Sequence, residues 1–135
     1  MKKIVYTLLL ATFIIGCATT NTKNDIANTA GNASDTVRIA NDSLEFEIII
    51  IEPGFNNWLV TQQPRGYYVQ PYLENRNLMR VIEYNNRVLE SSRFDPNIYL
   101  QQINYERGID YGYEVNYLLH NWFNFFERRY KQKLR

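Results

Sequence analysis

Large apolar side chains are densest near the C-terminal end of the chain, between Asp110 and Tyr130. At about 100° per residue, a helix through this stretch gathers most of them on one side and leaves polar residues on the other. Asp110 stands where a short carboxylate caps a first helical turn, and Arg128 and Arg129 stand where the helix dipole favours positive charge. We expect this helix to form the centre of the core, with these residues on its apolar side: Tyr111, Val115, Leu118, Leu119, Trp122, Phe123, Phe125, Phe126 and Tyr130.

A second helical pattern runs from Pro71 to about Ser91. Its charged residues share one face, and Pro71 suits a first helical turn. Asn85 lies in the middle of the apolar face, where we expect its amide to be buried and hydrogen-bonded to the backbone or to a tyrosine. A shorter helical pattern spans Phe55 to Thr61. The apolar face of the longer helix is predicted to carry Leu78, Val81, Ile82, Val88 and Leu89.

Two stretches have strand character. The range from Leu44 to Glu52 alternates apolar and acidic residues before four consecutive isoleucines, which predicts a strand that becomes buried on both faces. Pro53-Gly54 ends it with a turn. The range from Ile98 to Tyr105 shows no clean alternation, but its β-branched and aromatic content predicts a second short strand. The predicted fold class is therefore α+β: a small helix-rich domain in which two long helices pack with a short two-stranded sheet.

The beginning of the chain follows a different pattern, in which two lysines precede an apolar run from Ile4 to Ile15. That run has 12 residues, and a membrane-spanning helix needs about 20, so we predict a cleavable export signal. The motif Ile14-Ile15-Gly16-Cys17 resembles the lipobox of bacterial lipoproteins. This resemblance implies a signal peptide at residues 1–16 and attachment of the mature protein to a membrane through a lipid on Cys17. An ordinary signal peptide with an incidental cysteine is the alternative.

Residues 18–43 are mostly Thr, Asn, Ala, Ser and Asp. Such a composition cannot bury enough surface to offset its chain entropy, so we expect residues 17–43 to be the lipidated cysteine and a disordered tether. Residues 44–135 are then long enough for a single globular α+β domain. No acidic run follows Cys17, and analogy with lipoproteins therefore favours a lipid-anchored position in the cell envelope, at the outer membrane and facing the periplasm.

Composition argues against several classes of function. The formal net charge of +1 falls slightly below zero without the two lysines of the signal, which argues against a nucleic-acid partner. A single cysteine excludes an intrachain disulfide and a thiolate zinc site, and a single histidine, His120, excludes a multi-histidine site. The glycines are scattered and form no phosphate loop. We find no catalytic signature and expect neither a metal nor a cofactor.

Two classes of function fit an exported, anchored domain. The preferred one is a non-catalytic protein-interaction or structural module of the envelope. The alternative is binding or processing of a glycan such as peptidoglycan, for which the carboxylates of Glu52, Glu106 and Asp110 could converge. Stacking faces and a polar contact for that glycan would come from Trp58, Arg65, Tyr67 and Tyr68. Packing of a small core remains the simpler explanation of the aromatic content, which is 15% of the chain.

One stripe of the C-terminal helix has two interpretations. Tyr113, Tyr117, His120 and Asn124 recur on the side that faces away from Val115. In the first interpretation, the helix predicted after Pro71 packs on this stripe. In the second, the stripe is an exposed partner-binding patch, in which Tyr and His supply apolar area with polar tips. Burial of the stripe distinguishes the two.

Three segments carry a family resemblance: Ile48–Trp58, Val81–Val88, and Asp110–His120 leading into residues 125–127. Together they resemble an uncharacterised family of Bacteroidota lipoproteins, domain of unknown function family 6146, over essentially all of residues 44–134. No activity is assigned to that family. The resemblance therefore implies the anchor and the domain limits, and it implies no catalytic residue.

Overall fold

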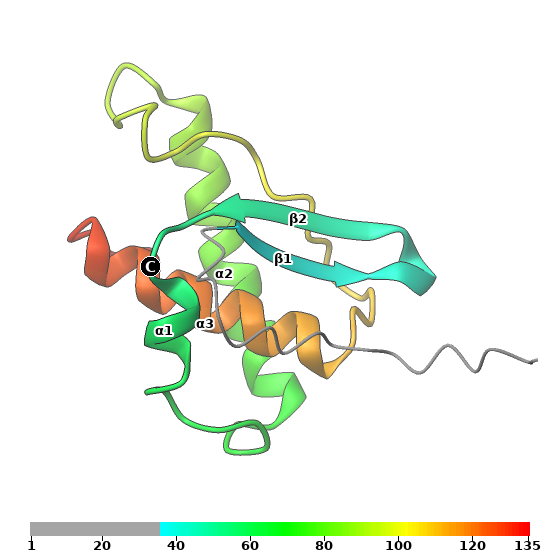
Figure 1. The fold of residues 1–135 in the computed structure, drawn as a ribbon. Coiled ribbons are helices and arrows are strands. Elements are labelled where there is room, and N and C mark those ends of the chain that lie inside the picture. Colours follow the sequence, from blue (N-terminus) through cyan, green and yellow to red (C-terminus); the bar gives the residue numbers. More distant parts are fainter. Residues whose placement is uncertain (1–35) are drawn as a thin grey trace, which may run out of the picture. The chain divides into compact units, whose positions relative to one another are not determined.

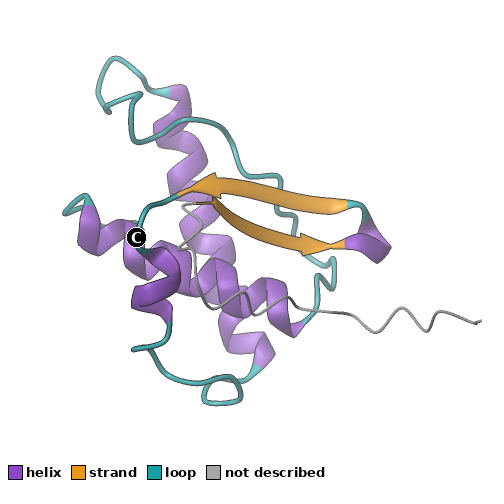
Figure 2. Ribbon diagram, in the orientation of Figure 1, coloured by secondary structure: helices purple, strands orange, loops and turns teal. Residues whose placement is uncertain are grey.

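The computed structural model describes residues 36–135. Strands β1 (Thr36–Asn41) and β2 (Phe46–Ile51) pair as an antiparallel hairpin, and the last helix contacts β1 and both other helices (Figure 1 and Figure 2). This arrangement confirms the predicted α+β class, with two long helices and a two-stranded sheet. In chain order the elements are β1 (Thr36–Asn41), a 3-10 turn (Asp42–Leu44), β2 (Phe46–Ile51), α1 (Phe55–Leu59), α2 (Gln70–Leu89) and α3 (Tyr113–Arg129).

The partner strand of β2 lies in a segment predicted to be a tether. The pairing runs from Thr36 opposite Ile51 to Asn41 opposite Phe46. Ile39 of β1 is completely buried, so this segment contributes to the core. A strand with one buried face needs few apolar residues, which explains why the composition concealed it. The tether prediction is wrong for residues 36–43. Residues 17–35 of the predicted tether lie outside the described part.

β2 buries only one of its two faces. Phe46 and Ile48 point into the core, whereas Ile49 and Ile51 are 53% and 73% exposed. The prediction of a strand end buried on both faces is therefore wrong, because the core lies on one side of the hairpin. Asn41 ties the hairpin to the chain before α3, since its Nδ2 donates to the carbonyl of Tyr111 at 2.9 Å.

Residues 98–105 form no strand. The amide of Asn85 on α2 holds their backbone instead, donating to the carbonyl of Ile103 and accepting from its N–H, both at 2.8 Å. Tyr99, Ile103 and Tyr105 turn into the core. The second strand was thus predicted wrongly, whereas the hydrogen bonding of Asn85 to the backbone is confirmed. The amide takes the place of a neighbouring strand.

The buried face of α2 is rotated from the predicted one. Ile82 and Leu89 are 53% and 70% exposed, although both were placed on the apolar face. Polar side chains enter the interface with α3 instead: Nδ2 of Asn77 donates to the carbonyl of Asn116 at 2.9 Å. The buried residues of α2 are Leu73, Asn77, Arg80, Val81 and Tyr84.

α3 begins at Tyr113, and Asp110 is not its cap. The cap position is held by Gly112, with φ 83° and ψ 164°, a conformation that glycine adopts most readily. Asp110 Oδ1 accepts from the N–H of Gly112 at 2.9 Å and from Nε2 of Gln70 at 2.7 Å. The capping prediction is therefore wrong, and Asp110 instead joins the starts of α2 and α3.

The core is built largely from aromatic rings. The ring of Tyr84 has four aromatic neighbours with centroids 5.3 to 6.2 Å away. Burial raises the pKa of Tyr84 to about 12. The aromatic content therefore serves mainly core packing, and the neighbours of Tyr84 are Tyr99, Trp122, Phe123 and Phe126.

Candidate functional site

The stripe of Tyr113, Tyr117, His120 and Asn124 on α3 is largely buried. Tyr117 and His120 are 3% and 4% exposed, and Tyr113 and Asn124 are half-buried. Part of the cover comes from the chain between α1 and α2, where the carbonyl of Gln63 accepts from the Tyr117 hydroxyl at 2.9 Å. The exposed-patch interpretation is therefore wrong for Tyr117 and His120, because the chain folds back over this side of α3.

This covering loop is attached to α3 at several points. The hydroxyl of Tyr113 accepts from the N–H of Gly66 at 2.7 Å and donates to the carbonyl of Tyr68 at 3.2 Å. The guanidinium of Arg65 forms an ion pair with Glu114, with Nε 2.7 Å from Oε2. The loop therefore presents its outer side chains from fixed positions.

Two tyrosines of this loop and one in the first turn of α2 form what we call the tyrosine patch: Tyr67, Tyr68 and Tyr72. Tyr67 is 60% exposed, Tyr72 is 43% exposed and Tyr68 is half-buried. The Tyr68 ring stacks on that of Tyr72 with centroids 4.9 Å apart, and the Tyr67 ring meets it edge-on at 4.7 Å. Val69, 68% exposed, adds apolar surface between them in the sequence. The patch is the candidate functional site.

His120 lies against the inner side of the patch. Its ring centroid is 5.4 Å from that of Tyr68 and 6.1 Å from that of Tyr72. Burial, with smaller contributions from Arg80 and Arg76, lowers the pKa of His120 to about 4. The imidazole is therefore neutral near pH 7 and is poorly suited to proton transfer there.

The four residues predicted for glycan binding do not form one site. Trp58 packs inward, with its ring centroid 5.4 Å from that of Phe125. The charge of Arg65 is engaged by Glu114. Only Tyr67 and Tyr68 of the four share a surface, through their mutual ring contact.

The three carboxylates considered for catalysis also do not converge. Glu52 is 5% exposed and accepts from the hydroxyl of Tyr130 at 3.3 Å, with Arg129 Nε 3.7 Å away. Burial raises the pKa of Glu52, and Arg129 and Tyr130 act against that increase. Glu52 is therefore an internal structural group, separate from Glu106 and Asp110, which line a cavity.

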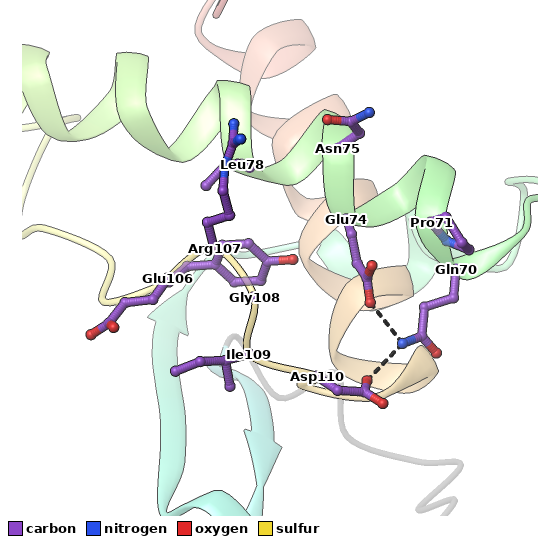
Figure 3. Close-up of a pocket in the computed structure, with 11 residues that line it drawn as sticks. Gln70, Pro71, Glu74, Asn75, Leu78, Glu106, Arg107, Gly108, Ile109 and Asp110 are labelled. Carbon is purple, nitrogen blue, oxygen red and sulfur yellow. Dashed lines mark hydrogen bonds between the residues drawn. The ribbon is translucent and has the colours of Figure 1, made fainter.

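That cavity lies between α2 and the loop before α3 and has a volume of about 560 Å³ (Figure 3). Glu74 and Asp110 both accept from Nε2 of Gln70, each at 2.7 Å. The carboxylate of Glu106 points away from these two in Figure 3. The carboxylates of Glu74 and Asp110 thus converge on the amide of Gln70. None of the residues predicted for glycan stacking lines the cavity.

Two negative findings concern residues 36–135. No group of three His, Cys, Asp or Glu side chains in this part could hold a metal ion. No helix among these residues is long and apolar enough to cross a membrane. Cys17, the predicted site of lipid attachment, lies outside the described residues.

Sequence reasoning missed Tyr72 and the basic residues that follow it on α2. Tyr72, Arg76 and Arg80 recur every four residues, which puts them on one side of a helix. The charged residues of this helix share one predicted face, yet Arg80 is only 5% exposed. The spacing from Tyr68 to Tyr72 was the signal that could have indicated a tyrosine surface.

Comparison with protein families gives a match over residues 5–135 to the family model described as "Family of unknown function (DUF6146)". No curated protein and no solved structure matches the chain. The family match confirms the resemblance at the level of the family.

Proposed function

Since the chain belongs to the DUF6146 family, a family of unknown function, we propose from the site itself that the protein is a non-catalytic interaction module of the cell envelope. The observation that carries this proposal is the tyrosine patch, a cluster of partly exposed aromatic rings on a firmly attached loop and the first turn of α2. Tyrosine is enriched at protein interfaces because one ring offers both apolar area and a polar tip.

The attachment of the patch supports docking more than core packing. Tyr113 holds the backbone of Gly66 and Tyr68, and Tyr117 holds that of Gln63. A loop whose backbone is already fixed loses little backbone freedom on binding, which lowers the entropic cost of association. The patch therefore has both the composition and the rigidity of an interface anchor.

The anchor is the second part of the proposal. The lipobox-like residues before Cys17 support lipid attachment there, which would hold the domain at a membrane surface of the envelope. Cys17→Ser should release the protein into the soluble fraction of cells and leave the export signal uncleaved. Labelling with a fatty-acid analogue measures the modification directly, and a mutant that is still labelled contradicts the assignment.

The docking proposal is tested by crosslinking in cells. Benzoylphenylalanine replaces Val69, which adjoins the patch and is 68% exposed. We expect a discrete crosslinked partner whose yield falls at least tenfold when Tyr67→Ser is added, because Tyr67 is the most exposed ring. Ile82→Ser is the matched control, since Ile82 is 53% exposed on α2. Absence of a discrete adduct, or equal loss in both variants, contradicts docking through the patch.

Glycan binding is the second candidate function. The cavity beside α2 supports it, whereas the four residues predicted for glycan binding do not form one site. Paired carboxylates and amides around an open cavity suit the hydroxyl groups of a sugar. Titration with soluble muropeptides, monitored by calorimetry, tests glycan binding. Asp110→Asn should abolish binding, and Glu90→Gln, just beyond the far end of α2, should not. A protein that binds no muropeptide eliminates this candidate.

A further inference from the structure

A cluster of basic side chains lies beneath the tyrosine patch. Arg76 and Arg80 follow Tyr72 at intervals of four residues, so all three share one side of α2. His120 meets this side from α3, with its ring centroid 6.1 Å from that of Tyr72 and its carbonyl accepting from Nη1 of Arg80 at 3.3 Å. The cluster therefore joins both long helices under the candidate docking surface.

The charges of the cluster do not balance. Within the described residues, Arg80 has one carboxylate partner, Glu127, at 3.4 Å. The other oxygen of Glu127 accepts from the N–H of Leu134 at 2.8 Å. Arg76 has no hydrogen bond or ion pair with any residue of the described part. Of the two guanidinium groups, only that of Arg80 has a carboxylate partner within residues 36–135.

Three nitrogen atoms of the cluster are buried without a hydrogen-bond partner among residues 36–135: Nε of Arg76, Nε of Arg80 and Nδ1 of His120. Arg80 and His120 are themselves 5% and 4% exposed. Burying an unpaired donor is costly, and a buried charge without a counter-charge is costlier. One bound oxyanion would accept from the two arginine Nε–H groups, and from His120 in the tautomer that carries its proton on Nδ1, and would neutralise the surplus charge.

We propose that this cluster binds a carboxylate of the docked partner, an Asp or Glu side chain or a C-terminus. The two guanidinium groups donate to its oxygens, a geometry for which Arg is well suited. Tyr72, which is 43% exposed, lies on the cluster's side of α2 with its ring centroid 6.1 Å from that of His120, and rotation of this surface side chain opens the way in. The neighbours of the acidic residue then pack on the tyrosine patch. The inference rests on the proposed docking function.

A solution experiment tests the cluster without a partner. His120 is the sole histidine of the chain, so its imidazole NMR signals report on this place alone. We expect sodium acetate to shift these imidazole signals saturably. Arg76→Gln should weaken the apparent affinity for acetate at least fivefold. Sodium chloride at equal ionic strength should cause no saturable shift. Arg93→Gln, at an exposed position beyond α2, should bind acetate as the native protein does. Equal acetate affinity in Arg76→Gln, or no saturable shift, overturns the proposal.

Two further measurements distinguish a free anion from a carboxylate of the partner, and the proposal for the cluster from the proposal of docking. Saturation by inorganic phosphate without saturation by acetate identifies a site for a free anion and overturns the partner's carboxylate. In cells, the crosslink from position 69 should fall at least tenfold with Arg76→Glu, persist with Arg76→Lys and persist with Arg93→Glu. A crosslink that Arg76→Glu leaves unchanged overturns this inference and leaves docking intact, whereas no crosslink in the native chain overturns both.

Discussion

At the scale of single residues, burial assigns different tasks to side chains of one type. Tyr117 and Tyr67 belong to the same part of the structure, yet Tyr117 is 3% exposed and Tyr67 is 60% exposed. The buried ring is covered by the guanidinium of Arg65, 4.6 Å from its centroid, and its hydroxyl is paired with a carbonyl. Tyr117 therefore stabilises the loop that carries Tyr67, and the two residues should respond differently to substitution.

Tyr117→Ala should lower the free energy of unfolding by roughly 3–5 kcal/mol, the range for removal of a core aromatic ring. Tyr117→Phe, which removes only the hydroxyl, should cost about 1 kcal/mol. Tyr67→Ser should stay within about 0.5 kcal/mol of the native protein, as is usual for exposed positions. Urea unfolding followed by circular dichroism measures all three. A Tyr117→Ala protein as stable as the native one would contradict the buried position.

His120 should make stability depend on pH. Its pKa is about 4 in the folded protein and near 6.5 when unfolded, so between these values the unfolded chain binds more protons. Stability is therefore fully present above pH 6.5 and declines as the pH falls toward 4, by about 3 kcal/mol. The raised pKa of Glu52 acts in the opposite direction at acid pH.

The matched comparison is His120→Gln, which keeps a polar side chain and removes the titration. The difference in unfolding free energy between native protein and variant, measured from pH 7 to pH 4, isolates the contribution of the imidazole. A difference that does not change with pH would show that the histidine titrates normally.

At the scale of elements, side chains replace backbone partners in two places. Asn85 pairs with both polar groups of Ile103, and Asp110 links the starts of α2 and α3. Periodicity predicted the three helices and β2 because their buried faces repeat along the sequence. It could not predict that residues 98–105 remain irregular, since their backbone is satisfied by an amide far away in sequence. The spacing also could not reveal β1, in which Ile39 is the buried apolar residue.

Asn85→Ala should destabilise the protein by about 2 kcal/mol, because it leaves a backbone donor and acceptor of Ile103 without their partner. The loop from residue 98 to residue 105 should then exchange its amide hydrogens faster than in the native protein. Hydrogen exchange with mass spectrometry measures this. Unchanged protection of the N–H of Ile103 would show that Asn85 does not hold the loop.

Removal of β1 should be far more damaging than removal of the residues before it. A chain that begins at residue 44 lacks the strand that pairs with β2 and exposes the core around Ile48. We expect it to lose cooperative thermal unfolding or to aggregate, since a lone strand leaves an unpaired edge. A cooperative transition in this shortened chain, equal to that of the mature chain, would contradict the role of β1.

At the scale of the whole molecule, residues 36–135 share one core around α3, which β1, α1 and α2 all contact. The fold class followed from sequence because amphipathic spacing is a local property. The candidate site did not, because the tyrosine patch depends on how the loop after α1 lies over α3. The same folding back that buries Tyr117 exposes Tyr67, and no local pattern distinguishes them.

A shared core predicts one unfolding transition. Trp58 contacts Phe125 near α1, and Trp122 contacts Tyr84 between α2 and α3. Fluorescence of single-tryptophan variants and far-ultraviolet circular dichroism should therefore give coincident thermal transitions. Separate midpoints for the two tryptophans would show that α1 and the long helices unfold independently.

The hairpin also determines how the domain would carry mechanical load. With the lipid anchor proposed at Cys17 and a partner bound at the tyrosine patch, a pull enters the domain at Thr36 and leaves β2 at Ile51. These two residues are opposite each other at the open end of the hairpin. Tension applied there separates the strands one residue pair at a time, instead of shearing all their hydrogen bonds together. Under force, the hairpin should therefore open before the helices, and a strained attachment would release at the sheet while α2 and α3 stay packed.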